Sequence, residues 1–237
     1  MSEPTKMKID EGSFGVMNYS GTKDGAISYK DVEIEESRFY LLTKRLIDIV
    51  GSATGLILLS PILLIVALAI KIESKGPVIF KQERVGQHGK HFFMYKFRSM
   101  VINAEELKEK LAAQNEMSGP MFKMKEDPRV TKVGRFIRKT SIDELPQLVN
   151  ILKGEMSLVG PRPSLPKEVA EFKPWMMRRL DVQPGLTCYW QVAGRNNIGF
   201  KEWMEMDVYY VNTRDLKTDI KLIFKTVGVL FGDSNAS

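Results

Sequence analysis

The sequence predicts an α+β protein, mostly helical with one β-hairpin, that is attached to a membrane through an apolar segment near its N-terminal end. Three observations support this fold class. The segment Leu46–Ile70 is strongly apolar, two strand-like segments at 78–85 and 91–100 surround a turn, and the segments that follow carry apolar residues at helical spacing. We therefore expect a membrane anchor joined to an α+β body.

Charge is unevenly distributed along the 237 residues, whose formal net charge is +6. Residues 1–37 hold four lysines and eight acidic residues, a net charge of −4, so the remaining 200 residues carry +10. The acidic segment has little apolar periodicity and is expected to be a mobile leader. The basic body favours anionic partners, and the composition excludes a disordered, collagen-like or disulfide-built chain. The single cysteine, Cys188, favours a reducing compartment.

The apolar segment Leu46–Ile70 is long enough to enter or cross a bilayer. As one straight helix it would extend about 37 Å, and the hydrocarbon core of a bilayer is about 30 Å thick. Asp48 is its only charged residue, and the segment lacks the polar stripe of a core helix. It is therefore predicted to lie in a membrane.

Two features bear on how this segment lies in the membrane. The Ser60-Pro61 pair interrupts it, because proline removes a helical hydrogen bond, and the serine hydroxyl can bond the carbonyl that proline leaves free. A spanning helix usually has its basic flank on one side, whereas a hairpin that returns to the same anionic surface has basic residues at both ends. This segment has basic residues at both ends: Lys44, Arg45, Lys71 and Lys75. These features alone leave a kinked span and a re-entrant hairpin equally open.

The other expected elements follow in order along the chain. Gly86 and Gly89 lie in the turn of the predicted hairpin, and Gly154 ends a short helix. The predicted helices lie at residues 103–114, 144–152, 167–180, 200–210 and 215–231, the last of them amphipathic. Residues 172–179 mix aromatic and methionine side chains with basic ones, which suits a membrane-interface helix and a core-facing helix equally.

The ten residues 138–147, RKTSIDELPQ, are the most informative for chemistry. A capping box of Ser141 and Glu144 would put Pro146 inside a helix. With Asp143 as N-cap, the proline falls in the first turn, where N–H groups lack partners anyway, so we expect the helix to begin there. An ionised aspartate among cations at a helix N-terminus suits a phosphate-directed nucleophile or a magnesium ligand. A plain cap is the simpler interpretation of this residue alone.

Several basic residues are candidates for binding phosphate. Arg162 lies between two prolines that fix its backbone, and Arg138 lies just before the acidic pair. Lys96 and Arg98 alternate along a predicted strand, and Arg195 follows a Tyr-Trp pair in a pattern that can stack a base and hold a diphosphate. Taken singly, each has a plain alternative: a stiff surface loop, a solvated strand face, or a core segment followed by a loop.

Together these motifs resemble those of the bacterial sugar transferases of the monotopic phosphoglycosyl transferase family. They occur in the order KRLID, LLSP, KGPVIFKQERVG, KFRSM, RKTSIDELPQL, MSLVGPRP, QPGLT, WQVAGRN and D-x-x-Y, over about residues 44–225. Several long motifs in one order are specific even where a single motif is not. The chain is similar to the short form of the family, which lacks the multi-span N-terminal region of many relatives.

The resemblance implies a reaction at a membrane surface. A UDP-hexose would give its sugar-1-phosphate to a polyprenyl phosphate such as undecaprenyl phosphate, and UMP would leave. This is the initiating step of a bacterial surface polysaccharide. Family members use an Asp-Glu dyad with Mg²⁺, and the matching residues are Asp143 and Glu144. Asp143 would attack the β-phosphorus and form a covalent phosphosugar intermediate, which the lipid phosphate would displace.

The resemblance also assigns some of the basic residues. Arg138 and Arg162 match arginines that contact phosphate in the family. A role for Lys96, Arg98 and Arg195 toward the donor phosphates is our own hypothesis. Cys188 stands where many relatives have glycine, and we expect no mechanistic consequence.

The Ser60-Pro61 pair matches the helix break of the family, which favours the re-entrant hairpin over the span. The expected organisation is a mobile leader at 1–37, a membrane-embedded helix-break-helix hairpin at 38–75 and a catalytic domain with interfacial helices at 76–237. Such a protein is monotopic, with its catalytic domain on the cytoplasmic face of the bacterial inner membrane. Its expected partners are the UDP-hexose, the polyprenyl phosphate and the cytoplasmic leaflet, and no nucleic-acid motif is found.

Two alternative functions remain open: a membrane-anchored scaffold without catalysis, and a module that binds anionic ligands through the basic stretch 123–139. The second predicts salt-sensitive binding that survives loss of Asp143. The sequence leaves open the hexose, the glycan pathway and the oligomeric state, a homo-oligomer included.

Overall fold

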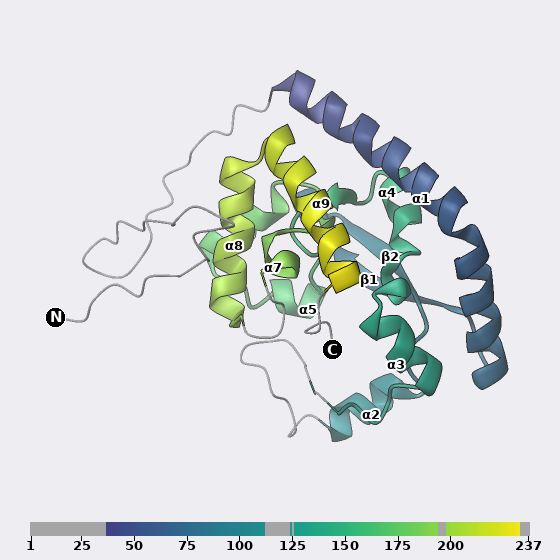
Figure 1. The fold of residues 1–237 in the computed structure, drawn as a ribbon. Helices are drawn as coiled ribbons and strands as arrows, with labels where there is room; N and C mark the ends of the chain where they lie inside the picture. Colours follow the sequence, from purple (N-terminus) through teal and green to yellow (C-terminus); the bar gives the residue numbers. More distant parts are fainter. Residues whose placement is uncertain (1–36, 112–123, 125, 194–197, 233–237) are drawn as a thin grey trace. The chain divides into compact units, whose positions relative to one another are not determined.

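The computed structural model describes residues 37–111, 124, 126–193 and 198–232, and Figure 1 shows how their elements are arranged. This part is mostly helical with two small sheets, which confirms the α+β class, and residues 1–36 of the predicted leader at 1–37 lie outside it. The elements in chain order are α1 (Arg38–Glu73), β1 (Ile79–Val85), η1 (Gln87–Gly89), β2 (His91–Phe97), α2 (Ala104–Lys110), α3 (Lys132–Lys139), η3 (Ile142–Glu144), α4 (Gln147–Lys153), β3 (Ser157–Val159), α5 (Pro166–Val169), α6 (Pro174–Met177), η4 (Arg178–Leu180), β4 (Gly185–Thr187), α7 (Tyr189–Val192), α8 (Phe200–Thr213) and α9 (Leu216–Gly232).

The apolar segment forms α1, a helix of 36 residues with Pro61 inside it. Ser60 Oγ donates a hydrogen bond of 2.8 Å to the carbonyl of Ile57, the group that loses its helical donor because residue 61 is proline. This contact confirms the predicted role of the serine hydroxyl. Figure 1 shows α1 as one bent helix rather than two antiparallel legs, so the structure does not confirm the predicted re-entrant hairpin.

Most apolar side chains of α1 are not covered by the rest of the protein. In its most apolar 18-residue stretch the mean hydropathy is 2.6 and 11% of the residues are buried. Ile57 and Leu58 are each 72% exposed. Among the residues that the structure describes, α1 is the one helix long and apolar enough to cross a membrane. A helix that exposes this much apolar surface is compatible with a membrane anchor.

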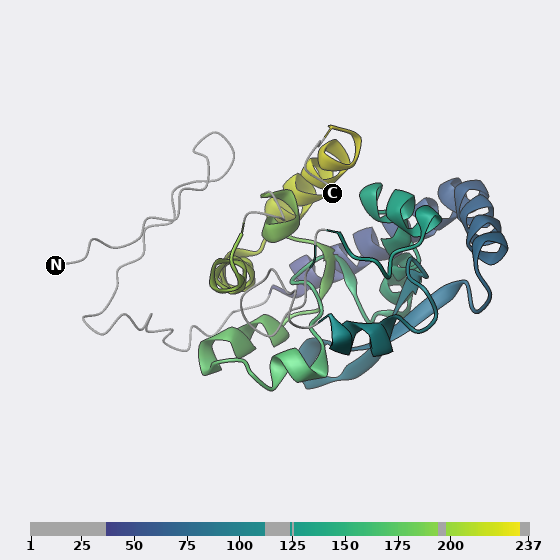
Figure 2. The ribbon, with the colours of Figure 1, turned by 90° about the horizontal axis from the view of Figure 1, so that it is seen from below.

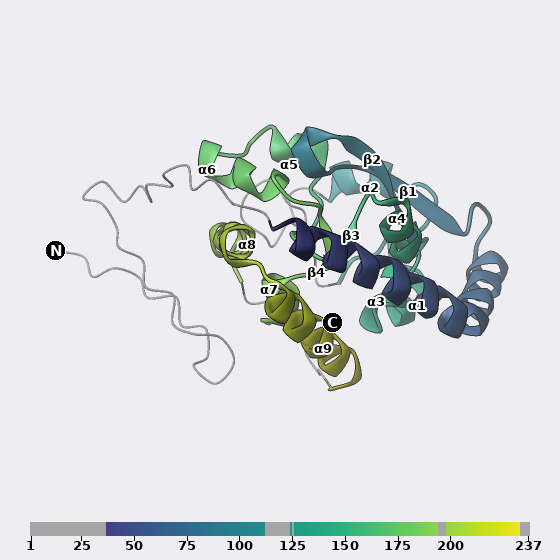
Figure 3. The same cartoon turned by 90° about the horizontal axis from the view of Figure 1, so that it is seen from above.

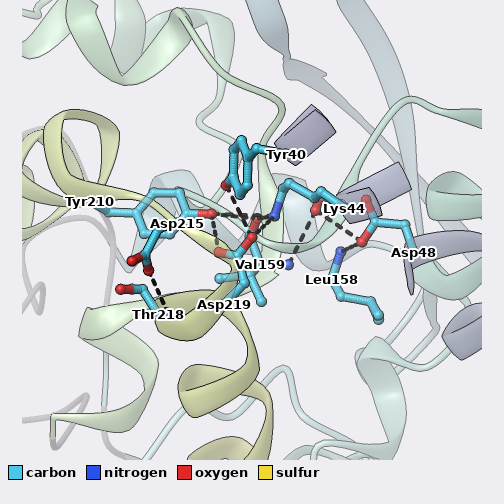
Figure 4. Close-up of polar contacts among 10 residues, drawn as sticks. Tyr40, Lys44, Asp48, Leu158, Val159, Tyr210, Asp215, Thr218 and Asp219 are labelled. Carbon is cyan, nitrogen blue, oxygen red and sulfur yellow. Dashed lines mark hydrogen bonds and ion pairs between the residues drawn. The ribbon is translucent and has the colours of Figure 1, made fainter. Parts of the chain in front are cut away.

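Polar residues near the start of α1 attach it to the body (Figure 4). Lys44 Nζ lies 2.8 Å from Asp219 Oδ2 of α9 and donates to the carbonyl of Val159 in β3 at 2.9 Å. Asp48, which is buried, accepts a 2.8 Å hydrogen bond from the backbone N–H of Leu158. The one charge within the apolar segment is therefore bonded to β3 instead of facing lipid.

The predicted hairpin is confirmed. β1 and β2 pair antiparallel, with Ile79 opposite Phe97 and Val85 opposite His91. A second sheet, in which β3 and β4 pair in parallel, was not predicted. Its strands have three residues each, which is too short for alternation of polar and apolar residues to show in the sequence.

The core lies between the hairpin and the helices. Met94 of β2 packs with Leu148 and Ile151 of α4 and with Met156, all of them buried. Figures 2 and 3 show α1, α3 and α9 toward one side of this core and the hairpin with α5 toward the other. The two sides are joined by α4 and β3, both of which contact α1.

The predicted helix at 167–180 is wrong, because the chain forms α5, α6 and η4 there. Lys173 is extended (φ −70°, ψ 155°), since a residue before proline avoids the helical conformation, and Pro174 follows it. Met176 and Arg179 are buried, which favours the core-facing alternative for this stretch. The last two predicted helices are confirmed as α8 and α9, and the one at 103–114 is described as α2, its last residues lying outside the described part.

Candidate active site

The predicted acidic pair lies in a turn between α3 and α4. Thr131 caps α3 by accepting a 2.9 Å hydrogen bond from the N–H of Gly134. After this helix ends, Ser141 adopts a left-handed conformation with φ 56°, which turns the chain, and η3 follows with Asp143 and Glu144. The turn packs against β2, so the pair faces the basic side chains of that strand.

Asp143 is not a helix N-cap, so that prediction was wrong. α4 begins at Gln147, and Pro146 occupies the N-cap position. A proline there removes no helical hydrogen bond, because the first N–H groups of a helix have no partner within it. Asp143 instead lies in the η3 turn and is 8% exposed. Its electrostatic environment therefore comes from neighbouring side chains.

Two basic side chains hold Glu144 in place. Lys96 Nζ of β2 lies 2.7 Å from Glu144 Oε1, and Arg162 Nη2 lies 3.0 Å from the same oxygen. The three side chains are between 16% and 22% exposed. Burial opposes the charged form of Glu144, but Arg162 and Lys96 outweigh it and hold the pKa of this carboxyl well below its usual range. Glu144 is therefore an ionised counter-ion fixed between two cations.

Asp143 differs from its neighbour in partners and in titration. Within the part of the chain that the structure describes, no hydrogen bond or ion pair engages its carboxylate. Burial raises the pKa of Asp143, and the negative charge of Glu144 adds to the rise. Three cations act in the opposite direction without reversing it: Lys96, Arg138 and Arg162. A carboxylate that is partly desolvated and unpaired among cations is well suited to attack an electrophile such as phosphorus.

The two arginines of the site differ in their exposure and in their contacts. Arg138, in the last turn of α3, is exposed to solvent. Arg162 lies with its guanidinium 5.9 Å from the ring centroid of Trp190, and this ring stacks on Trp203 at 4.4 Å. The structure thus brings Arg138, Arg162 and Lys96 together around Asp143 and Glu144, three of the five basic residues proposed from the sequence.

Comparison with known proteins bears directly on this group of residues. The family model described as "Bacterial sugar transferase" matches residues 39–233, which include every residue of the site. The chain belongs to this family. Residues 39–233 begin within α1, so the family pattern includes the apolar helix as well as the body.

Several curated relatives of the sugar transferase family are similar to the chain. Galactosyl transferase CpsE of Streptococcus agalactiae is 47% identical over 81% of this chain and 42% of its own length. The undecaprenyl-phosphate galactose phosphotransferase of Salmonella typhimurium is 45% identical over 79% of this chain and 40% of its own. Exopolysaccharide production protein ExoY of Rhizobium meliloti is 37% identical over 78% of this chain and 84% of its own. The chain therefore spans about two fifths of the length of the first two relatives.

The acidic pair fits a magnesium ion. Magnesium is usually bound through one or two carboxylates together with substrate phosphates. The carboxylate of Asp143 and Oε2 of Glu144 accept no hydrogen bond from the described residues, so both can serve as ligands. No group of three or more histidine, cysteine or acidic side chains forms a metal site in that part of the chain, so substrate oxygens would have to complete the coordination. The magnesium site remains a prediction.

One of the proposed phosphate-binding residues, Arg98, does not join this group. Arg98 is buried and donates to the carbonyls of Lys75 and Ser74 at 2.6 and 2.8 Å, so it binds the C-terminal end of α1. β2 ends at Phe97, so Arg98 lies outside the strand, and the alternation of side chains along a strand does not place it beside Lys96. Arg195 lies outside the described residues.

The sequence did not reveal what fixes Arg162. Trp190 was interpreted as a residue that can stack a base, but in the structure Trp203 already stacks on it. The signal for this contact was weak, because the two tryptophans lie in different helices and only their presence in one chain is visible in the sequence. Asp207 and Tyr210, the D-x-x-Y motif, received no role from the sequence; both are buried.

Proposed function

We propose that the chain is a phosphoglycosyl transferase that moves a sugar-1-phosphate from a UDP-hexose to a polyprenyl phosphate such as undecaprenyl phosphate. The products are a polyprenyl diphosphate-sugar and UMP, and the reaction begins the assembly of a bacterial surface polysaccharide. The relatives support this proposal through what their names state: an undecaprenyl-phosphate galactose phosphotransferase, an undecaprenyl-phosphate glucose phosphotransferase and an exopolysaccharide production protein. The observation that carries it is the Asp143 carboxylate, which no described residue pairs, beside Glu144, whose Oε1 is bound by both Lys96 and Arg162.

The first step is an attack by Asp143. A carboxylate oxygen of the ionised side chain forms a bond to the β-phosphorus of the donor, and the bond from that phosphorus to the bridging oxygen breaks. UMP leaves with the bridging oxygen, and the sugar phosphate stays on Asp143 as an acyl phosphate. Arg138 and Arg162 lie where they can offset the charge of the diphosphate, because both act on the charge of Asp143.

The second step returns Asp143 to its starting state. An oxygen of the polyprenyl phosphate bonds to the same phosphorus, and the bond to the Asp143 carboxylate breaks. Glu144 keeps Lys96 and Arg162 in place through both steps, because its pKa is held well below neutral pH. Mg²⁺ held by Asp143 and Glu144 would offset negative charge on the diphosphate and on the leaving UMP.

The lipid substrate requires the site to lie at a membrane surface. We infer that α1 enters the cytoplasmic leaflet and returns to the same side, with its bend at the Ser60-Pro61 pair. Exposed apolar side chains along α1 and basic residues at both of its ends support this topology. The catalytic body would then lie on the cytoplasmic face of the bacterial inner membrane.

An assay of UMP release tests the activity. The protein in detergent is supplied with a panel of UDP-hexoses, undecaprenyl phosphate and Mg²⁺, and UMP is measured over time. We expect release with the wild type and loss of at least 100-fold, roughly the effect of removing a catalytic group, in Asp143→Asn. Asp181→Asn, at a side chain that is 51% exposed, is the matched control and should remain active. Full activity of Asp143→Asn would refute the role of Asp143, and a wild type without UMP release would favour a non-catalytic scaffold.

Cysteine labelling in membrane vesicles tests the topology. Cys188 is fully buried and should not react, so new cysteines can be introduced without removing it. Arg38→Cys and Lys75→Cys place single exposed thiols at the two ends of α1. A re-entrant helix predicts that an impermeant maleimide reaches both from the cytoplasmic side. Labelling of the two positions from opposite sides would establish a span instead.

A further inference from the structure

The segment Val159–Ser164 carries Arg162 from β3 toward Glu144 and has few backbone N–H groups with which to donate hydrogen bonds. Pro161 and Pro163 have no N–H, so the segment is held mainly through its carbonyl groups. The Pro163 carbonyl accepts from Arg84 at 3.0 Å, and the Pro161 carbonyl accepts from a backbone N–H of β4 at 2.9 Å. The position of Arg162 therefore depends on donors supplied by the elements around it.

Arg179 holds the far end of this segment and is itself held by α8. Its guanidinium donates to the carbonyl of Arg162 at 2.6 Å and to the hydroxyl of Ser164. It also lies 2.6 Å from Asp207 Oδ2, and the two side chains are 1% and 0% exposed. Burial raises the pKa of Asp207 to about 6 although Arg179 opposes the rise, so the carboxylate is still ionised at neutral pH. A buried arginine with this partner has little freedom to move.

Tyr210, one helical turn further along α8, lies at the near end of the segment (Figure 4). Its hydroxyl is 3.2 Å from the carbonyl of Val159 and 2.7 Å from Asp219 Oδ1, and it accepts from Lys44 at 3.3 Å. Asp207 and Tyr210 are three residues apart and therefore lie on the same face of the helix. One face of α8 thus supports both ends of the segment that carries Arg162, the near end through Tyr210 and the far end through Arg179.

We propose that Asp207 and Tyr210 are positioning residues that together fix the two ends of the segment Val159–Ser164 and so hold Arg162 on Glu144. Asp207 acts through Arg179. The single hydroxyl proton of Tyr210 is shared between Asp219 Oδ1 and the carbonyl of Val159, and Tyr210 holds that carbonyl together with Lys44, which donates to it at 2.9 Å and to the Tyr210 hydroxyl at 3.3 Å. Neither residue contacts the acidic pair. This inference rests on the proposed function for its kinetic consequences, but the clamp on the segment is a property of the fold and can be measured separately.

The first test measures the segment without reference to activity. Amide hydrogen exchange followed by mass spectrometry reports the protection of peptides that cover residues 158–165, where the N–H of Gly160 is bonded to Thr187 at 2.9 Å. Tyr210→Phe removes only the hydroxyl, and exchange in this peptide should become faster. Tyr209→Phe is the matched control on the same helix, because its ring contacts Tyr189 and does not reach the segment. Unchanged exchange in Tyr210→Phe and in Asp207→Asn would overturn the proposal.

The second test asks whether Asp207 and Tyr210 affect kcat/KM through the position of Arg162. Both Tyr210→Phe and Asp207→Asn should lower kcat/KM for the donor about tenfold to 100-fold at temperatures where each variant is fully folded, as expected for a displacement of about 1 Å. Each should cost much less in an Arg162→Ala background, because the group they position is then absent. Fully additive losses would contradict the proposal and indicate a general structural role.

Controls separate the possible failures. Arg179→Lys keeps the charge but cannot reach three acceptors at once, so it should reproduce the kinetic loss even if Asp207→Asn fails to fold. Asp181→Asn breaks the 3.8 Å ion pair between Arg178 and the half-exposed Asp181 and should leave kcat/KM unchanged. If the wild type itself releases no UMP, the proposed function fails, and the exchange experiment still decides the clamp.

Discussion

Replacing Glu144 by glutamine removes one negative charge from the acidic pair and leaves the size of the side chain almost unchanged. In the wild type, both Lys96 and Arg162 are bound to Glu144 Oε1, at 2.7 and 3.0 Å, and none of the described residues pairs with Asp143. The neutral amide cannot keep both cations, so at least one of them is expected to move toward the remaining carboxylate of Asp143. The nucleophile would then be engaged in an ion pair.

The size of the effect follows from these contacts. Each charge-assisted hydrogen bond contributes about 1.5–3 kcal/mol, and the amide retains a weaker one, so the loss in unfolding free energy is about 2–4 kcal/mol. This corresponds to a fall in Tm of roughly 4–16 °C for a chain of this size. In catalysis, a shift of about 1 Å in Arg162 and Lys96 lowers kcat about 100-fold. The pKa of Asp143 should also fall, because Glu144 raises it in the wild type.

The assay is UMP release measured from pH 4.5 to 8 together with thermal melts. Glu144→Gln should show a lower kcat and an acid limb of the pH profile displaced to lower pH, since Asp143 is then ionised more easily. Glu171→Gln, at an exposed side chain, is the matched control and should change neither. Wild-type kcat with an unmoved acid limb in Glu144→Gln would refute the division of roles between the two carboxylates.

Three further predictions follow from other contacts. Lys44→Met leaves Asp219, which is 5% exposed, without its cation and should lower the unfolding free energy by about 3 kcal/mol; Lys71→Met, at an exposed lysine, is the control, and equal melting temperatures would contradict the docking of α1 through this pair. Trp190→Ala should lower kcat/KM about tenfold by loosening Arg162, whereas Trp190→Phe keeps a ring and most of the activity; equal losses would argue against the stack. Because the pKa of Glu144 is held below its ordinary value of 4.5, the stability it contributes is fully present above that pH and is lost as the pH falls further. The difference in Tm between wild type and Glu144→Gln should therefore shrink below pH 4.5, and a constant difference would be the contrary result.

Local features of the fold could be predicted from the sequence. The hairpin is visible from two strand-like segments and a glycine turn, and the hydrogen bond from Ser60 to Ile57 follows from the chemistry of proline alone. The adjacency of Asp143 and Glu144 is given by the chain itself. Each of these depends on residues that are close in sequence, where spacing and propensity carry the information.

Long-range features could not be predicted in this way. The parallel pairing of β3 with β4 joins two three-residue strands far apart in the chain, and the stack of Trp190 on Trp203 joins two helices. Arg98 was placed by strand alternation, but the strand ends one residue earlier and the side chain binds the end of α1. The interruption before Pro174 is local, since a residue before proline avoids the helical conformation, but the helical periodicity of residues 167–180 does not show it.

The central claim is that Asp143 carries the sugar phosphate between donor and acceptor. It is tested most directly by mixing the protein with a UDP-hexose and Mg²⁺ in the absence of polyprenyl phosphate, followed by intact and peptide mass spectrometry. The account predicts a single turnover of UMP and a mass increase of one hexose phosphate on the peptide that contains Asp143. The added mass should disappear when polyprenyl phosphate is supplied. UMP release that requires both substrates at once, with no modified peptide at any time, would contradict it.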